Sequence, residues 1–171
     1  MDLGIIGRVA VIGGGSKGLG RACADSLAKE GTNLVICSRN SDDLVQTAKE
    51  ISSTTGVDVL PVAADLSRLS DIQFLIERTV NHFGRLDILV NNAVILATEP
   101  SQGVEDTTLA QWRQVQEINS EGVFHGCQHG IAAMKANGGA IVNLSSIAGL
   151  VATPHIFAYG ASKAAVRQLT K

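Results

Sequence analysis

The feature that most limits how this chain can fold is the regular alternation of short apolar runs with longer amphipathic stretches. The apolar runs have strand length and few polar interruptions, which is typical of parallel strands covered on both faces. The stretches between them repeat apolar residues at helical spacing. Alternating β and α elements predict an α/β fold with a doubly wound parallel sheet in three layers. The predicted strands are 8–13, 33–38, 58–63, 86–91 and 140–145, and the predicted helices cover about 18–30, 41–55, 68–83 and 107–136.

The length of the chain favours one domain. A sequence of 171 residues with 45% hydrophobic residues can bury one substantial core, so we expect residues 1–171 to form a single domain. Glycines mark the ends of helical stretches, with Gly31 and Gly56 after two of them and Gly84 before the fourth strand. Glycine closes a helix cheaply because it adopts the left-handed conformation without strain.

Charge and leader composition argue against several classes of function. Fourteen basic and sixteen acidic residues give a formal charge of −2, so we expect no broad basic surface and no nucleic acid partner. Residues 1–8 lack a basic leader with a long apolar run, and no later stretch reaches a membrane-spanning length. Cys23, Cys37 and Cys127 are odd in number and widely spaced. We therefore expect a cytoplasmic protein with no membrane partner and three cysteines that serve only in packing.

A glycine-rich loop directly follows the first predicted strand and leads into a helix. A turn without side chains lets backbone N–H groups approach a phosphate, and the helix dipole favours negative charge there. A plain flexible turn has a similar composition, but this loop closes the first strand of a βαβ unit, where dinucleotides bind. We therefore expect a dinucleotide phosphate at this loop. Within the segment 13–20, the predicted cofactor contacts are Gly14, Ser16, Lys17, Gly18 and Leu19.

The end of the second predicted strand indicates which nicotinamide cofactor would bind. Ser38 and Arg39 stand where an acidic residue would accept hydrogen bonds from the adenosine ribose of NAD. Arg39 and Lys17 can instead bind a 2′-phosphate through charge-assisted hydrogen bonds. The alternative is that both are solvated surface charges. The pattern predicts NADP(H) rather than NAD(H).

Tyr159 and Lys163 form a second chemical unit near the end of the chain. Their spacing of four residues places both on one face of a helix. A nearby ammonium group favours the phenolate, which makes the phenol a better proton donor to, or acceptor from, a carbonyl or alcohol oxygen. A surface tyrosine beside a surface lysine has the same spacing. However, Ser145 and Ser146 follow the fifth predicted strand at the sheet edge where α/β ligand sites form.

Taken together, these segments resemble the classical short-chain dehydrogenase/reductase family, including members similar to 3-oxoacyl-[acyl-carrier-protein] reductase. The resemblance covers essentially all 171 residues in the order of the family. Two positions depart from its pattern. Gly13 replaces a common threonine, and Val94 replaces a glycine, which costs strain if that position needs positive φ. The matching features are the spacing of Gly14, Gly18 and Gly20, the segments 64–66 and 91–94, Asn119, and Ser146 thirteen residues before Tyr159.

The resemblance implies a Rossmann fold, an NADP(H) site and hydride transfer between nicotinamide and a carbonyl carbon. Tyr159 would move the proton, and Lys163 would tune Tyr159 and bind the nicotinamide ribose. Ser146 would orient the substrate oxygen, with Ser145 as its competitor, and Asn119 would support a proton relay. Asp65 would accept a hydrogen bond from adenine, although it equally fits a helix cap. Further cofactor contacts implied are Leu66, Asn92, Ala93, Tyr159 and Lys163.

The resemblance also implies that the chain ends within the helix of Tyr159, with the C-terminal strands of the family missing. We therefore expect little reductase activity from residues 1–171 alone, and a homo-oligomer, dimer or tetramer, at full length. The expected substrate is a small carbonyl or alcohol compound, because Ile95, Leu96 and 151–157 would form an apolar wall.

Two other interpretations fit parts of the sequence. One is a non-catalytic dinucleotide-binding fragment or regulatory remnant. The other is a metal site at His125 and His129, which are four residues apart on a predicted helix. We expect no metal there, because a third ligand and the glutamate of a metalloprotease motif are missing.

Overall fold

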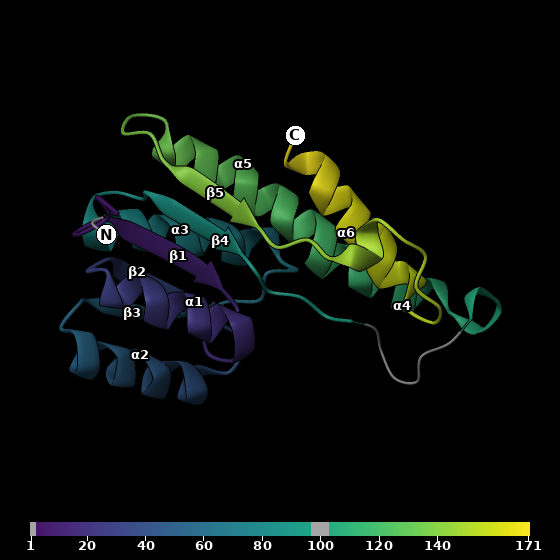
Figure 1. The fold of residues 1–171 in the computed structure, drawn as a ribbon, viewed down its shortest axis with the longest axis horizontal. Helices are drawn as coiled ribbons and strands as arrows, with labels where there is room; N and C mark the ends of the chain where they lie inside the picture. The colour runs from purple at the N-terminus through teal and green to yellow at the C-terminus, as the bar shows by residue number, and fades with distance from the viewer. Residues whose placement is uncertain (1–2, 97–102) are drawn as a thin grey trace.

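The protein is a three-layer α/β structure built on one parallel sheet. The computed structural model describes residues 3–96 and 103–171. Its sheet has five strands in the order β3-β2-β1-β4-β5 (Figure 1). This arrangement confirms the doubly wound fold predicted from the alternation of apolar runs. The strands are β1 Val9–Gly13, β2 Asn33–Ser38, β3 Val59–Ala63, β4 Ile88–Asn91 and β5 Ala140–Asn143.

The helices lie close to the predicted ranges, with one local difference. The stretch 107–136, expected as one helix, consists of two α-helices joined by a π-helical turn, η2. Gly56 and Gly84 end α2 and α3 in the left-handed conformation, as their positions predict. The α-helices are α1 Gly18–Lys29, α2 Ser41–Thr55, α3 Leu69–Phe83, α4 Leu109–Gln116, α5 Gly122–Met134 and α6 Phe157–Leu169. The shorter elements are η1 Val104–Asp106, η2 Glu117–Glu121 and η3 Ile147–Gly149.

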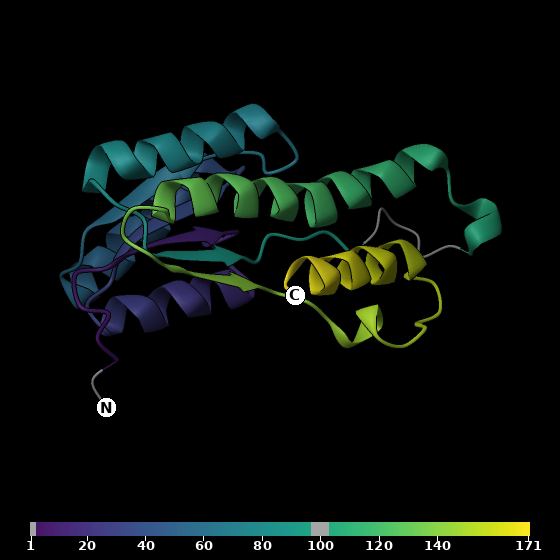
Figure 2. The same ribbon diagram turned by 90° about the horizontal axis from the view of Figure 1, so that it is seen from above.

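Two apolar cores lie on the two faces of the sheet. On one face, side chains of β1 and β2 such as Ile12 and Ile36 pack with apolar side chains of α1 and α2. On the other face, Val11 and Val35 pack with side chains of α3 and α5. Figure 2 shows α3 and α5 above the sheet and α1 below it. The alternation of side chains along each strand therefore supplies both cores.

The expectation that every strand is covered on both faces is wrong for β5. All five residues of β1 are buried, whereas Ala140 is exposed and Val142 is 50% exposed. The physical reason is the position of β5 in the sheet. β5 lies at the edge of the sheet beside β4, and α5 packs on one of its faces. An apolar run of strand length shows that a strand exists, but not how many neighbours it has.

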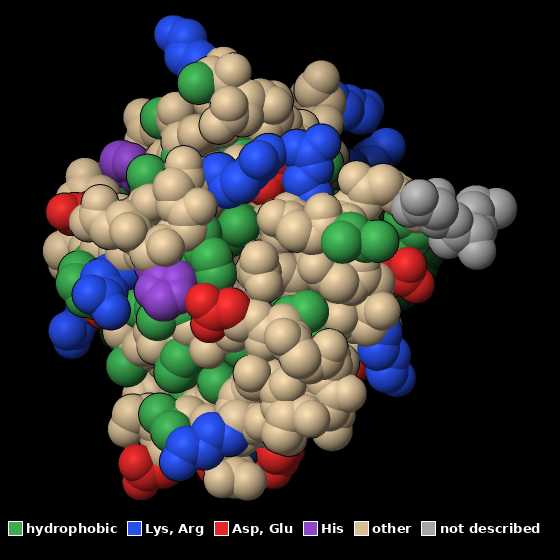
Figure 3. Space-filling model, turned by 90° about the vertical axis from the view of Figure 1, so that its left-hand side faces the viewer, with side chains coloured by type: hydrophobic (Ala, Val, Ile, Leu, Met, Phe, Trp, Pro, Cys, Tyr) green, Lys and Arg blue, Asp and Glu red, His purple; other side chains and the backbone are tan. Residues whose placement is uncertain are grey.

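The strands all run the same way, so their carboxyl ends lie together at one end of the sheet. The loops after β1, β4 and β5 leave from this end (Figure 1). At the opposite end, Figure 3 shows basic, acidic and histidine side chains in small separate groups among uncharged surface. Within residues 3–96 and 103–171, no helix is long and apolar enough to cross a membrane. Cys23, Cys37 and Cys127 are free thiols.

Candidate active site

A cleft of about 340 Å³ opens at the carboxyl ends of the strands. Segments far apart in the sequence meet there: the glycine loop after β1, the end of β2, and the loops after β3 and β4. Most of the predicted cofactor contacts line it. The lining residues are Gly14, Ser16, Lys17, Cys37, Ser38, Arg39, Ala64, Asp65, Leu66, Ala93, Val94, Ile95 and Ile118.

The glycine loop is held by main-chain contacts. The N–H groups of Gly14 and Gly15 donate to the Cys37 carbonyl oxygen at 2.9 and 3.1 Å. Gly14 and Gly18 have φ of +69° and +55°, which side chains disfavour. A Cβ at Gly20 would collide with the Gly14 carbonyl oxygen and with Asn92. The loop therefore requires glycine at these positions for its shape.

The N-terminus of α1 opens onto this loop. Its N-cap residue, Lys17, makes no side-chain hydrogen bond to the first turn. The first N–H groups of a helix lack intrahelical partners and carry the positive end of the dipole. This donor set fits a phosphate group of a dinucleotide. Leu19, one of the predicted contacts, is 70% exposed, and neither it nor Gly18 lines the cleft.

The two departures from the family pattern have structural explanations. A Cβ at Gly13 would lie 3.1 Å from Leu66 Cδ1, so a larger residue there would require Leu66 to move. The condition for strain at Val94, a positive φ, is not met, because His155 is the only non-glycine residue with positive φ in the described part of the chain. The backbone at Val94 suits an ordinary residue, and its side chain lines the cleft at 43% exposure.

Asn92 has a structural contact that the sequence did not reveal. Its Nδ2 donates to the Gly13 carbonyl oxygen at 2.8 Å, which ties the loop after β4 to the end of β1. It does not line the cleft. The neighbouring Ala93 does, so the predicted pair divides into one residue that braces the loop and one that faces the cleft.

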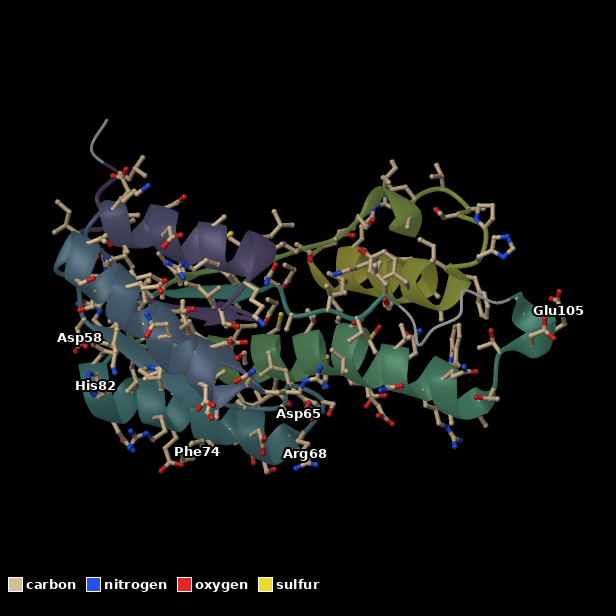
Figure 4. All side chains as sticks on the ribbon, turned by 90° about the horizontal axis from the view of Figure 1, so that it is seen from below. Asp58, Asp65, Arg68, Phe74, His82 and Glu105 are labelled. Carbon is tan, nitrogen blue, oxygen red and sulfur yellow. The ribbon has the colours of Figure 1, made fainter. Side chains whose placement is uncertain are left out.

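Asp65 closes a turn and also faces the cleft. Its Oδ1 accepts hydrogen bonds from the backbone N–H and the hydroxyl of Ser67, at 3.0 and 2.8 Å. Partial burial would raise the pKa of Asp65, but the Ser67 hydrogen bonds and the charges of Arg39 and Arg68 outweigh it and lower the pKa. Asp65 is therefore ionised at neutral pH. Figure 4 shows Asp65 and Arg68 near the start of α3.

Two cations line the cleft, and they differ in their contacts. Lys17 Nζ lies 2.6 Å from Asp43 Oδ2 on α2. Arg39 lies close enough to Asp65 to lower the pKa of that carboxyl. No acidic residue occupies the last position of β2, which is Ser38.

Tyr159 and Lys163 lie on the same side of α6, as their spacing predicts. Lys163 Nζ is 5.7 Å from the centre of the Tyr159 ring. The lysine is 3% exposed, and its Nζ donates to the Leu144 carbonyl oxygen at 2.6 Å. Burial lowers the pKa of Lys163, because desolvation disfavours the ammonium form. A buried lysine beside a half-buried tyrosine is a candidate proton-transfer pair.

The two serines after β5 have different contacts. Ser145 Oγ donates to the Lys163 carbonyl oxygen at 3.0 Å, which holds α6 against the end of β5. Ser146 Oγ accepts from Ala148 N–H at 3.2 Å and caps η3. The Ser146 hydroxyl hydrogen is not used in that bond. The contacts therefore favour Ser146 over Ser145 as the serine that could donate to a substrate oxygen.

Asn119 links the loop after β4 to α6 from a completely buried position in η2. Its Oδ1 accepts from Ile95 N–H at 2.9 Å, and its Nδ2 donates to the Ile95 carbonyl oxygen at 2.8 Å and to Ser162 Oγ at 3.1 Å. The π turn widens the helix here, since Gly122 N–H donates to Glu117 O, five residues back. Such turns are frequent at functional sites.

Some residues of the site were missed in the sequence. Ile118 and Cys37 line the cleft, and Ser162 joins Asn119 to α6. The position of Ile118 beside Asn119 was the one available signal. His125 and His129, the alternative metal pair, lie on α5, and the described residues contain no group of three metal-ligating side chains.

Comparison with known proteins gives consistent matches. The sequence pattern of the short chain dehydrogenase family matches residues 8–171. An NADP-dependent (R)-specific alcohol dehydrogenase of Lentilactobacillus kefiri is 41% identical over 168 residues, covering 96% of this chain and 64% of that protein. A trans-4-hydroxycyclohexanecarboxylate dehydrogenase of Sinomonas cyclohexanicum is 40% identical, with coverage of 96% and 64%.

Solved structures match over the same extent. A levodione reductase superposes with a TM-score of 0.92 at 33% identity, covering 97% of this chain and 64% of that one. An NAD⁺-bound xylitol dehydrogenase gives a TM-score of 0.91 at 30% identity, with coverage of 97% and 63%. The chain thus spans less than two thirds of the length of these relatives.

Proposed function

Because the chain belongs to the short-chain dehydrogenase family, we propose that it carries the cofactor site and reacting side chains of an NADP(H)-dependent oxidoreductase. The reaction is the interconversion of a ketone or oxoacyl group and a secondary alcohol. Residues 1–171 form its single dinucleotide-binding domain. The substrate is a small carbonyl or alcohol compound, and the full-length protein forms a dimer or tetramer.

One observation carries this proposal. The cleft beside the glycine loop lies at the carboxyl ends of the strands, and the buried Lys163 beside Tyr159 is bound to Leu144, directly after β5, at the same ends, where α/β proteins bind ligands. Either feature alone has structural explanations. Together they supply a binding site for a dinucleotide and a proton-transfer pair.

The residues of the cleft fit a dinucleotide. The bare main chain at Gly14 and the uncapped N-terminus of α1 suit the pyrophosphate. The ionised Asp65 suits the adenine amino group, and Ala93 leaves room for close approach. Lys163 would bind the ribose of the nicotinamide.

The preference for NADP(H) rests on charge. Lys17 and Arg39 line the cleft, and β2 ends in Ser38 rather than in a carboxylate that would repel a 2′-phosphate. The relatives include proteins of both kinds, one described as NADP-dependent and one solved with NAD⁺. The preference is therefore argued from this chain's own side chains.

The chemistry divides between cofactor and protein. A bound nicotinamide supplies or accepts the hydride. Tyr159 gives its phenolic proton to the carbonyl oxygen during reduction and takes it back during oxidation. Lys163 stabilises the phenolate, and Ser146 donates a hydrogen bond that holds the oxygen in place. Asn119 braces α6 through Ser162 and keeps Tyr159 and Lys163 in register with the cleft.

The substrate side is apolar. A second cleft of about 300 Å³ lies between the segment after η3 and α6. Its lining includes Leu150, Val151, Ile156 and Phe157, all without charge. These side chains favour an apolar ketone, keto ester, acyl or steroid-like compound over a highly charged one.

The test is NADPH binding followed by turnover. We expect NADPH fluorescence to report binding to the unaltered protein and to the Tyr159→Phe variant with similar dissociation constants. Oxidation of NADPH with a panel of ketones should be lost in the variant, because phenylalanine has no proton to transfer. Unchanged turnover in Tyr159→Phe contradicts the proposed role. Binding without turnover in the unaltered full-length protein would indicate a dinucleotide-binding module instead.

A further inference from the structure

We propose that Asp43 limits how strongly this protein prefers a 2′-phosphorylated cofactor, because it holds one of the two cations of the cofactor cleft in an ion pair. The inference rests on the proposed function. It concerns a residue that lies outside the cleft and that the sequence motifs did not single out.

The ion pair competes directly with a phosphate. Lys17 lines the cleft, yet its Nζ lies 2.6 Å from Asp43 Oδ2. The Lys17 side chain is 75% exposed and free to turn toward the cleft. A 2′-phosphate that recruits Lys17 must therefore break or share its contact with Asp43. Arg39, the other cation of the cleft, has no such competition from Asp43 in the described contacts.

Asp43 is fixed in place by contacts that do not involve Lys17. It lies in the first turn of α2, where the helix dipole favours a carboxylate. The Asn40 side chain caps this turn and accepts from the backbone N–H groups of Asp42 and Asp43 at 3.0 and 3.3 Å. The carboxylate therefore stays beside the glycine loop when Lys17 moves away.

The glycine loop is itself tied to α2. Thr47, one turn after Asp43, is 5% exposed, and its hydroxyl donates to the Ser16 carbonyl oxygen at 3.4 Å. The same hydroxyl accepts from Arg21 on α1 at 3.4 Å. Partly buried contacts thus hold the start of α2 near the loop. Asp43 cannot move away from the glycine loop without disturbing them.

The effect of Asp43 should depend on the 2′-phosphate. Its carboxylate both occupies Lys17 and repels a nearby dianion, and NADH lacks that group. An exposed ion pair is weak, so the phosphate can still recruit Lys17 and the penalty is modest. Removing the charge of Asp43 should therefore tighten NADPH and leave NADH unchanged.

Asp42 provides a matched control. It is the neighbouring carboxylate in the same first turn of α2, and its Oδ1 accepts from the Ser41 hydroxyl at 3.4 Å rather than pairing with Lys17. Asp42→Asn and Asp43→Asn change the net charge equally and remove the same interaction with the helix dipole. They differ in the contact with Lys17.

The experiment measures dissociation constants by calorimetry for NADPH and NADH, and for the fragments 2′,5′-ADP and 5′-AMP. We expect Asp43→Asn to tighten NADPH and 2′,5′-ADP by about two- to fivefold, the range of one exposed ion pair. NADH and 5′-AMP should change by less than about 1.5-fold, as should every ligand in Asp42→Asn, because charges outside direct contact are screened. In a Lys17→Ala background, the gain from Asp43→Asn should shrink.

Three results overturn the inference. Equal tightening in Asp42→Asn would show a general charge effect. A gain that persists undiminished in Lys17→Ala would show that the ion pair is irrelevant, and unchanged affinity in Asp43→Asn would show no effect of this carboxylate. If the unaltered protein binds neither NADPH nor NADH, the proposed function itself fails. Equal affinities for NADPH and NADH contradict only the proposed cofactor preference.

Discussion

The part of the molecule that carries the glycine loop and the part that carries Tyr159 are held together in different ways. β1 and the centre of β2 are completely buried between two helical layers. From β5 to the residue after η3, by contrast, Val142, Ile147 and Leu150 are 50%, 68% and 58% exposed. Apolar packing buries the strands beneath the glycine loop, whereas the segment around β5 and η3 is more exposed and individual hydrogen bonds add to its packing on α6.

The hydrogen bonds of the second region converge on α6. Lys163 donates to Leu144 O, Ser145 donates to Lys163 O, and Asn119 donates to Ser162. The end of the helix is held too, since Asn143 Nδ2 donates to Thr170 Oγ1 at 3.1 Å. The comparison teaches that the glycine loop is built on a rigid apolar core. The predicted reacting side chains on α6 are held in part by a few polar contacts.

Two truncations of apolar side chains test whether β2 is more tightly packed than β5. Ile36 in β2 is completely buried, so we expect Ile36→Ala to lower the free energy of unfolding by about 2–5 kcal/mol. Val142→Ala in the half-exposed β5, which removes one carbon fewer, should cost less than about 1 kcal/mol. Urea unfolding measures both. Similar losses would mean that β5 is as well packed as β2.

The buried Asp87 should make the stability of the packed region depend on pH in acid. Its side chain is 5% exposed and accepts hydrogen bonds from Val9 N–H, Arg8 and Arg85. Removing the charge leaves buried donors with a weaker acceptor. Asp87→Asn should therefore lower the free energy of unfolding by about 1–3 kcal/mol near neutral pH.

The pH dependence of that cost has a defined sign. Burial would raise the pKa of Asp87, but hydrogen bonds and the charge of Arg85 outweigh it and lower the pKa below the ordinary 3.8. The carboxylate therefore stabilises the fold above about pH 4, and this contribution is lost as the pH falls through the lower folded-state pKa. The gap between the unaltered protein and Asp87→Asn should close in acid.

A second carboxylate serves as the control for Asp87. Asp58 is 57% exposed and pairs with His82 at 2.7 Å, at the end of the molecule away from Asp65 (Figure 4). Asp58→Asn should cost less than about 1 kcal/mol, as exposed ion pairs usually do. A cost equal to that of Asp87→Asn would show that burial does not decide the value of these pairs.

Two glycines sharpen the distinction between stability and binding. Gly18 and Gly56 both have positive φ, and an added Cβ would meet nothing within 4 Å at either. We expect Gly18→Ala and Gly56→Ala each to cost about 1–2 kcal/mol of backbone strain. Only Gly18→Ala should weaken NADPH binding in a fluorescence titration. Equal affinities for NADPH in the two variants would show that Gly18 has no part in cofactor binding.

The smallest effect concerns Lys163 and alkaline pH. Burial lowers the pKa of Lys163 in the folded protein below its unfolded value of about 10.5. Between these two pKa values the unfolded state holds more protons, so stability should rise with pH, by at most about 1.4 kcal/mol per pH unit. The rise should disappear in Lys163→Met. A slope that survives this substitution must come from other groups.

Much of the fold was predictable because periodicity reports local structure. The ranges of β2 and α2 were predicted correctly, and Gly56 and Gly84 end their helices as expected. The exposure of β5 was not, because an apolar run looks the same at the edge of a sheet as at its centre. The π turn at Asn119 was also missed, since one extra residue in a helical turn hardly changes the spacing of apolar residues.

Only the parts of the site that belong to local sequence motifs were predictable. The position of Lys163 beside Tyr159 follows from helical spacing and is seen in the structure. The contact of Asn92 with Gly13 O and the pairing of Lys17 with Asp43 depend on tertiary packing between distant segments. No local sequence pattern predicts such contacts. The roles of the reacting residues stay predictions until variants are measured.

The most direct measurement is a crystal structure of the protein with NADPH. The pyrophosphate should lie against the backbone N–H groups of Gly18 to Gly20, with the 2′-phosphate beside Arg39 and Lys17 and the nicotinamide beside Tyr159. A dinucleotide bound in another cleft, or bound here with the nicotinamide toward Arg39, would contradict the proposed function.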